Sequence, residues 1–516
     1  MKSIEENGVW FLPNNPDKKI YGQLKFSAEE HPKLNLLDQL QEIKLDNNIF
    51  KGLKFDIVNG YLVNDKKVTL CNCVQSGRFT TNSIQTSTVY AKYLIIGHHF
   101  KTLEEICLNG VSLRYKNLED WVDLPNFEIN SSASDEHNQI KEINIKQVTQ
   151  EPIELGKLLD FSLTLCDEPI GLERLHMAGC FRTVDNKITL EVRKSIIVRA
   201  DSEKRLEDII DVIYLSQKLL IFASGQMTYP FDIKSDIVVI EEKISLPPDV
   251  RCDLISGFNN PNQTTKEVVP IVEEKEKSVP LKIYFQVRES ENSEAKFNSR
   301  RVLFSFKDVK EQFTELLSHW EENSKKLESV IDLYLRLTYI PKRHINDIFL
   351  SLAQAIEAFH GLAHSGRHID KKIYRKVVRK ALEEAVNSIP DSIPLENEAE
   401  ESLDLREYKR ILKEEKLSHL NSFSLRERLE EIVSEYRSCL PDNFFTPQED
   451  QSRFLEKIRK TRNHLTHLSS DQDEYVASGQ DLEILSRRLM VLLEACLLKQ
   501  LGLEDVDVKT ITSRNR

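Results

Sequence analysis

Hydrophobic and polar positions follow two different periods along this chain. Up to about residue 300, short alternating or apolar stretches are separated by turn signals such as Asn59-Gly60 and Asn109-Gly110. From Ser305 onward, the apolar positions recur at helical spacing. The pattern therefore predicts an α+β multidomain protein, with a β-rich N-terminal half of sandwich or barrel type followed by an all-helical bundle.

The same pattern divides the chain into parts. We expect a β-rich domain over 1–128, a second α+β part over 150–300 and a helical domain over 305–516. The predicted strands are 22–26, 67–74, 87–96, 106–115, 161–166, 187–199, 237–240 and 282–287, with one helix over 202–223 and polar loops over 130–136 and 257–280. The predicted helices are 309–339 with a bend, 344–364, 370–387, 405–417, 425–439, 447–468 and 481–501, with a loop over 388–404.

Composition and charge narrow the class of protein. The chain of 516 residues has a net charge of −12, which argues against indiscriminate binding along nucleic acid and leaves room for a local basic site. The sequence contains no run of about 18 apolar residues, which is the length that would predict a membrane span. The acidic N-terminus lacks an apolar signal core, and the eight cysteines are scattered. We therefore expect a cytoplasmic protein with reduced thiols.

The segment 447–468 carries the clearest helix signals. Thr446 stands at an N-cap position, Pro447 at the first helical position and Glu449 three residues after the cap, which together form a capping box with a proline start. One arc of this helix is apolar and predicts the buried face. Its members are Phe454, Leu455, Ile458, Thr461, Leu465 and Leu468.

The opposite side of this helix carries Arg459, Asn463 and His467, with Arg462 at its edge and His464 on the other flank. Arginine supplies a forked positive charge for a phosphate, and histidine takes and gives a proton near neutral pH. Cleavage of RNA by its own 2′-OH needs a proton acceptor, a proton donor and positive charge on the oxyanion. We therefore interpret Arg462, Asn463 and His467 as catalytic candidates, and His464 either as a packing residue or as a second proton carrier.

These residues carry a family resemblance. The run RNHLTH at 462–467 matches the R-N-x-x-x-H form of the motif of HEPN ribonucleases. The run GVWFLP at 8–13 and the segment FLSLAQAIEAFH at 349–360 resemble the ApeA family of bacterial anti-phage proteins, which place an N-terminal domain ahead of a HEPN domain. The HEPN similarity covers roughly the last 210 residues, the size of one domain.

The resemblance implies a metal-independent endoribonuclease of abortive-infection defence, acting as a homodimer without a cofactor. Host RNA, with tRNA as the best candidate, would be cut to leave 2′,3′-cyclic phosphate and 5′-OH ends. The N-terminal half would sense an unknown phage-derived trigger. Two alternatives remain open: a non-catalytic RNA-binding or dimerisation module acting as a phage sensor, and a metal-dependent hydrolase. In the metal-dependent hydrolase, the candidate zinc ligands would be Glu357, His360, His364, His464 and His467.

Two further sets of residues are candidates for supporting the site. Glu357, His360 and His364 share one stripe of the helix 344–364, from which Glu357 could hold Arg462 or His467 in place. A basic stripe on the helix 370–387, which Arg459 would extend, fits an RNA backbone or else a solvated helix face. It consists of Lys371, Lys372, Arg375, Lys376, Arg379 and Lys380.

Overall fold

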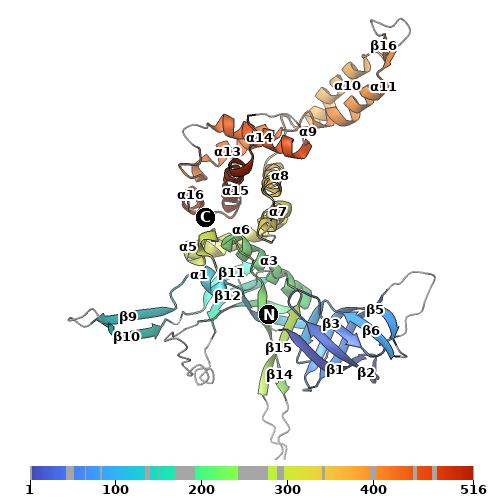
Figure 1. Ribbon diagram of the computed structural model, residues 1–516, viewed down its shortest axis with the longest axis vertical. Coiled ribbons are helices and arrows are strands. Elements are labelled where there is room, and N and C mark those ends of the chain that lie inside the picture. The colour runs from blue at the N-terminus through green and yellow to red at the C-terminus, as the bar shows by residue number, and fades with distance from the viewer. Residues whose placement is uncertain are drawn as a thin grey trace, which may run out of the picture. The chain divides into compact units, whose positions relative to one another are not determined.

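The chain forms two compact units in the computed structural model, Met1–Thr314 and Glu315–Arg516. We call them the N-terminal and the C-terminal unit; Figure 1 draws the first from blue to yellow-green and the second from yellow to red. The structure describes residues 3–514 except 42–51, 64, 82–83, 134–139, 149, 169–191, 242–276, 288–295, 340–342, 395–401, 446–449 and 468–473. The predicted order of a β-rich half and a helical region is confirmed.

Six strands of the N-terminal unit close into a barrel (blue in Figure 1). In order of pairing they are β5 (Lys67–Thr81), β4 (Leu53–Leu62), β1 (Ile4–Leu12), β2 (Asn15–Phe26), β3 (Lys33–Leu36) and β6 (Ile84–Tyr90). The barrel closes because β6 pairs back onto β5, and all neighbours are antiparallel. Closure gives each of these strands a partner on both sides, so the barrel offers no free strand edge.

Alternate residues of the barrel strands point inward and build its core. Trp10 on β1 is fully buried, and its indole N–H donates to the carbonyl of Gly22 on β2 (3.4 Å). The rest of the core is mainly aliphatic, as the period of two predicts. It includes Ile20, Leu24, Phe26, Leu34, Leu36, Val58, Leu62, Val68, Leu70 and Val89.

A sheet continues from the barrel through β7 (Tyr93–Ile96), which pairs with β5 and with β15 (Lys277–Phe285). The next strands in order are β14 (Pro230–Glu241), β8 (Cys107–Tyr115), β13 (Lys194–Arg205), β12 (Phe161–Asp167) and β11 (Ile153–Leu158). Helix α3 (Leu206–Ser224) packs on β8 and β13, and its apolar face is buried there. Strands of the two expected N-terminal parts therefore share one sheet.

Several predicted boundaries in this unit are wrong, and strand pairing explains three of them. The strand expected over 87–96 is split into β6 and β7, because these two pair with different stretches of β5. The loop expected over 130–136 begins as a strand, since β9 (Phe127–Ala133) forms a hairpin with β10 (Ile140–Gln147). The helix expected from residue 202 begins at Leu206, because Lys204 and Arg205 still pair with β8.

The C-terminal unit is built around helix α8 (Ile345–Ala363). The helices α7 (Glu328–Tyr339), α13 (Leu425–Glu435), α14 (Gln451–His467) and α15 (Gly479–Gln500) all pack against it. Its buried face carries Phe349, Leu352, Ile356 and Phe359. The predicted bend within 309–339 lies at Leu327, between α6 (Phe313–Lys326) and α7. One short helix, α16 (Asp505–Thr512), was not predicted.

A helical hairpin, which we call the arm (371–419), is inserted between α8 and α13. It runs out through α9 (Lys371–Ile373), η4 (Tyr374–Val378) and α10 (Arg379–Asn387), and returns through α11 (Arg406–Ile411), η5 (Leu412–Lys416) and α12 (Leu417–His419) (Figure 1). The segments η4 and η5 are π-helical turns. The loop predicted over 388–404 contains paired strands, β16 (Ser392–Pro394) and β17 (Ser402–Asp404).

Candidate active site

The helix that carries the candidate motif, α14, begins at Gln451. The carboxylate of Asp450 accepts the backbone N–H of Arg453 (2.8 Å), which is the geometry of an N-cap. The helix therefore starts one turn later than predicted, with a cap that the sequence analysis did not choose. The predicted capping box at 446–449 lies outside the described residues.

The buried face of α14 is anchored by a hydroxyl group. Thr461 is fully buried, and its Oγ1 accepts the N–H of Ala477 (2.9 Å) and donates to the carbonyl of Tyr475 (3.5 Å). The predicted burial of Phe454, Leu455, Ile458 and Thr461 is confirmed. Leu465 is only partly buried, and Leu468 lies outside the described residues.

Arg462 is held between two neighbours. Its Nη2 lies 3.6 Å from Oε2 of Glu357 on α8, and its Nη1 donates to Oδ1 of Asn463 (3.4 Å). The side chains of Arg462 and Glu357 are 34% and 28% exposed. Because neither is buried, the guanidinium keeps part of its surface open to solvent while its orientation is restrained from two sides.

The two motif histidines differ in exposure. His467 is the last residue of α14 and is exposed, and no described side chain hydrogen-bonds to it. It follows Arg462 at a rise of about 7.5 Å along the helix axis. His464 is half-buried, and its Nδ1 is buried without a hydrogen-bond partner among the described residues. The open end of the helix therefore presents His467 to solvent and keeps His464 against the protein.

His360 and His364 face α13, whereas Glu357 on the same helix meets α14. Nε2 of His360 lies 2.6 Å from Oε2 of Glu431, and Nδ1 of His364 lies 3.6 Å from Oε2 of Glu435. The two rings stack with centroids 4.9 Å apart. Burial lowers the pKa of His360, although hydrogen bonding to Glu431 opposes this shift. The neutral His360 ring donates through Nε2 to Glu431. The two histidines therefore meet α13, whereas Glu357, which contacts Arg462, meets α14.

Three residues that organise this region were missed by the sequence analysis. Glu431 and Glu435 lie one turn apart on α13, which matches the spacing of the two histidines that they meet. That matched spacing was the available signal. Arg428, also on α13, donates to the backbone carbonyl of Glu357 (3.2 Å) and so fixes the helix turn from which Glu357 reaches Arg462. Nothing in the sequence indicated this contact.

The predicted basic stripe lies on the outgoing limb of the arm. Its side chains are exposed apart from Arg379, which pairs with Glu383 (2.7 Å). Among the described residues, the other five form no ion pair, and their charged groups are exposed to solvent. They are Lys371, Lys372, Arg375, Lys376 and Lys380.

Arg459, which was expected to extend the basic stripe, is committed to a neighbour instead. Its Nε donates to Oε2 of Glu456 (3.0 Å), and Arg426 donates to the same carboxylate (3.2 Å). The hydrogen bond from Arg459 is the main cause that lowers the pKa of Glu456. Arg459 therefore offers a phosphate less charge than its place in the sequence suggested.

Within the described part of the chain, no group of three or more His, Cys, Asp or Glu side chains is arranged to hold a metal ion. None of the helices there combines the length and the apolar character that a membrane span requires.

Two family models match the chain. The model described as ApeA N-terminal domain 1 matches residues 5–320, and the model described as Apea-like HEPN matches residues 350–507. The second range includes most of α8 and all of the arm, α13 and α14. No curated protein and no solved structure matches it. HEPN domains are generally ribonucleases, so the candidate motif lies in a domain of nuclease type. Because the first model spans more than half of the sequence, the chain belongs to the ApeA family, with its N-terminal domain followed by a HEPN domain.

Proposed function

We propose that this chain is an endoribonuclease that cleaves host RNA, with tRNA as the first candidate, in defence against phage. One observation carries the proposal: Arg462, which a HEPN nuclease would need at the phosphate, is oriented by Glu357 and Asn463, while His467 stands exposed on the same helix. A charge held in place and an accessible proton carrier on the same helix are two of the groups that phosphodiester cleavage requires.

The proposed chemistry uses the substrate's own nucleophile. A histidine accepts the proton of the 2′-OH, the 2′-oxygen bonds to the adjacent phosphorus, and the bond from phosphorus to the 5′-oxygen breaks. A second proton carrier protonates the leaving 5′-oxygen. The products are a 2′,3′-cyclic phosphate and a 5′-OH. Arg462 stabilises the negative charge on the phosphorane-like transition state, and Asn463 orients Arg462 or the phosphate.

This mechanism needs two proton carriers, and one chain exposes a single motif histidine at the end of α14. His464 is half-buried, so it is poorly placed to exchange protons with a substrate. A homodimer in which two copies of α14 face each other would supply one His467 as the base and the other as the acid. Glu357 acts in this scheme as a positioning residue for Arg462.

Purified protein should be incubated with total tRNA in EDTA, beside His467→Ala and Arg462→Ala. His419→Ala is the matched control, because His419 is also exposed but lies on α12 of the arm. The proposal expects the native protein and the control to leave cyclic phosphate and 5′-OH ends, and both motif variants to cleave at least about a hundredfold more slowly. An extract of phage-infected cells should be added in parallel, since an unrestrained nuclease would be toxic to its host.

Several results would contradict the proposal. If the motif variants cleave as the native protein does, the reaction belongs to another site. If the native protein binds tRNA but never cleaves it, with or without infected extract, the chain is a binding module. If EDTA alone abolishes cleavage, the hydrolase depends on a metal ion.

The dimer has its own test. The activity per chain should fall on dilution through the concentration at which mass photometry shows dimers dissociating. His467→Ala added in excess should then suppress the native protein by forming mixed dimers. Full activity per chain in a solution of monomers would exclude the shared site.

A further inference from the structure

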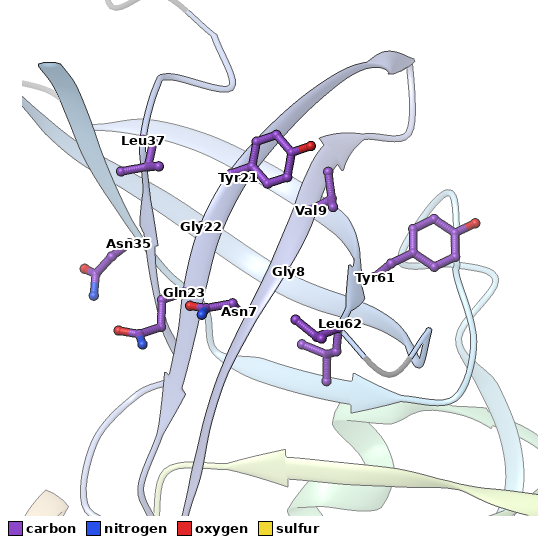
Figure 2. Close-up of a pocket in the computed structure, with 11 residues that line it drawn as sticks. Asn7, Gly8, Val9, Tyr21, Gly22, Gln23, Asn35, Leu37, Tyr61 and Leu62 are labelled. Carbon is purple, nitrogen blue, oxygen red and sulfur yellow. The ribbon is translucent and has the colours of Figure 1, made fainter. Parts of the chain in front are cut away.

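The outer wall of the barrel contains a hollow that the nuclease chemistry does not use (Figure 2). We call it the barrel hollow. Its volume is about 630 Å³, within the range of pockets that hold small molecules. Strands β1 to β4 line it, so it lies wholly within the N-terminal unit. Gly8 and Val9, the first two residues of the run GVWFLP at 8–13, are among its lining residues.

Two glycines lie at the centre of the barrel hollow. Gly8 on β1 pairs directly with Gly22 on β2. A Cβ atom on Gly8 would lie 2.4 Å from the carbonyl oxygen of Tyr61, and one on Gly22 would lie 2.6 Å from that of Asn35, so neither position accepts a side chain. Trp10 lies beneath them and donates to the Gly22 carbonyl. The centre of the wall is therefore backbone alone, held down from inside the barrel.

A row of amide side chains borders the barrel hollow. Asn7, Gln23 and Asn35 are cross-strand partners on β1, β2 and β3. Figure 2 shows Asn7 and Gln23 side by side. Within the described part of the chain, the amides of these two make no hydrogen bond, whereas Oδ1 of Asn35 accepts one from Thr88 (3.3 Å). Each amide offers two N–H donors and a carbonyl acceptor.

The adjacent row is aromatic and aliphatic. Val9 pairs with both Tyr21 and Tyr61, and the N–H of Leu37 donates to the Tyr21 carbonyl (3.0 Å). Tyr21 and Leu37 are 69% and 61% exposed. The Tyr61 ring is restrained by His99, whose centroid lies 4.6 Å away. Large apolar groups that are exposed together in this way are typical of a binding surface.

The lining restricts the chemistry of a ligand. None of the described side chains that line the barrel hollow is charged, so the bound group should be neutral. The closed barrel offers no strand edge to an extended peptide, so recognition must use side chains. A sugar carries hydroxyls around its whole ring and needs polar partners on many sides, whereas here the amides form one row. A flat group with apolar faces and a polar edge fits this lining, because its faces can pack on the aromatic row and its edge can hydrogen-bond to the amide row.

We propose that the barrel hollow binds a nucleobase. The base would stack on Tyr21, as bases stack on aromatic side chains of other proteins, and its edge would meet the amides of Asn7 and Gln23. The base can belong to a free nucleotide or to a single strand of nucleic acid, since both present the same ring. This site does not depend on the nuclease mechanism, because it lies in the other unit.

The test is calorimetric titration of the full chain carrying His467→Ala, which prevents loss of RNA ligands. The probes are AMP, GMP, CMP and UMP, their eight-residue homo-oligonucleotides, and ribose 5-phosphate as a ligand without a base. Tyr21→Ala should weaken binding of the preferred base about tenfold. Gln23→Leu should change the preference among the four bases. Tyr90→Ala is the matched control, because Tyr90 is 42% exposed on β6 but does not line the barrel hollow.

The outcomes separate clearly. Binding of a mononucleotide as tight as that of its oligonucleotide assigns the site to free nucleotides, and tighter binding of the oligonucleotide assigns it to nucleic acid. The proposal is overturned if no base-containing probe binds by about 1 mM, the weak end of specific affinity. It also fails if ribose 5-phosphate binds equally, or if Tyr21→Ala and Tyr90→Ala bind alike. If no probe binds but Tyr21→Ala alone loses activation by infected extract, the surface belongs to a protein partner.

Discussion

Two histidines of the HEPN domain have opposite surroundings. His467 is exposed at the end of α14, whereas His360 is fully buried in α8 and hydrogen-bonded to Glu431. Their sequence contexts look alike, since each lies on an amphipathic helix beside other polar residues. The difference teaches that the neighbouring helix decides what a histidine can do: the exposed ring can exchange protons with a substrate, and the buried ring holds two helices together.

The largest expected effect is on cleavage. His467→Ala should reduce the rate of RNA cleavage by at least about a hundredfold, because it removes a general acid–base group. His364→Ala should leave the rate within a few-fold, since His364 faces Glu435 on α13. Initial rates on the best RNA substrate measure both. Equal losses of cleavage rate in the two variants would show that His467 has no special role in the reaction.

The second effect is on stability. His360→Ala should lower the free energy of unfolding by about 2–4 kcal/mol, because it removes a fully buried ring and its hydrogen bond. Urea unfolding of the C-terminal unit, followed by helical circular dichroism, measures this loss. His467→Ala should change it by less than about 0.5 kcal/mol, as for other exposed positions. A stable His360→Ala variant would show that the buried pair does not hold α8 to α13.

The third effect tests the positioning of Arg462. Glu357→Gln keeps the shape of the side chain but removes the charge that meets Arg462, and should lower kcat about tenfold with little change in KM. Glu431→Gln is the control, since Glu431 meets His360 instead. Combining Glu357→Gln with Arg462→Ala should add no further loss. Additive losses would mean that Glu357 acts independently of Arg462.

A smaller effect is expected from the arm. Replacing Lys372 and Lys376 with glutamine should raise KM several-fold without changing kcat, if these side chains contact the RNA backbone. The slope of log KM against log salt should decrease by about 0.7 for each lost phosphate contact. The control replaces Lys307 and Lys310, which are also exposed but lie outside the HEPN match. Identical salt slopes for both pairs would mark the basic stripe as a solvated face.

The smallest effect concerns pH. Burial lowers the pKa of His360, so the unfolded chain binds a proton more readily than the folded one, and the stabilisation is present above the unfolded pKa of about 6.5. It is lost as the pH falls below that value. The melting temperature should therefore drop between pH 7.5 and 5.5, and His360→Gln, which keeps a hydrogen-bond donor for Glu431 but cannot titrate, should drop less. Equal drops would assign the acid sensitivity to other groups.

The sequence predicted the elements of the fold better than their partners. Alternation of apolar residues indicated a β-rich half of sandwich or barrel type, because the period of two is local. It could not indicate that β6 returns to β5 or that β7 leaves the barrel, since these pairings depend on contacts made by segments far apart. The start of α14 was misplaced for a local reason: Thr446 and Asp450 are both good N-cap residues, and the pattern does not rank them.

The same limit applies to the candidate site. Helical phase placed Arg462 and Asn463 on a polar side of α14 and Glu357 on a stripe of α8, and the structure brings these three together. The stripe alone could not show that His360, one turn further on, meets a different helix. Only the position of α13 separates them, and helix packing is not encoded in the spacing of one helix.

The shared strand β5 has a consequence for the order in which the protein is made. The first residues of β5 pair with β7, and its later residues pair with β6 and so close the barrel. The other edge of β7 pairs with β15, which is made much later. The barrel strands can all pair once residue 90 is made, but the ribosome must synthesise about residue 285 before β7 has both of its partners. Pairings between such distant segments form slowly, so a chain released or cut near residue 128 would leave β7 and β8 with unpaired edges that invite aggregation.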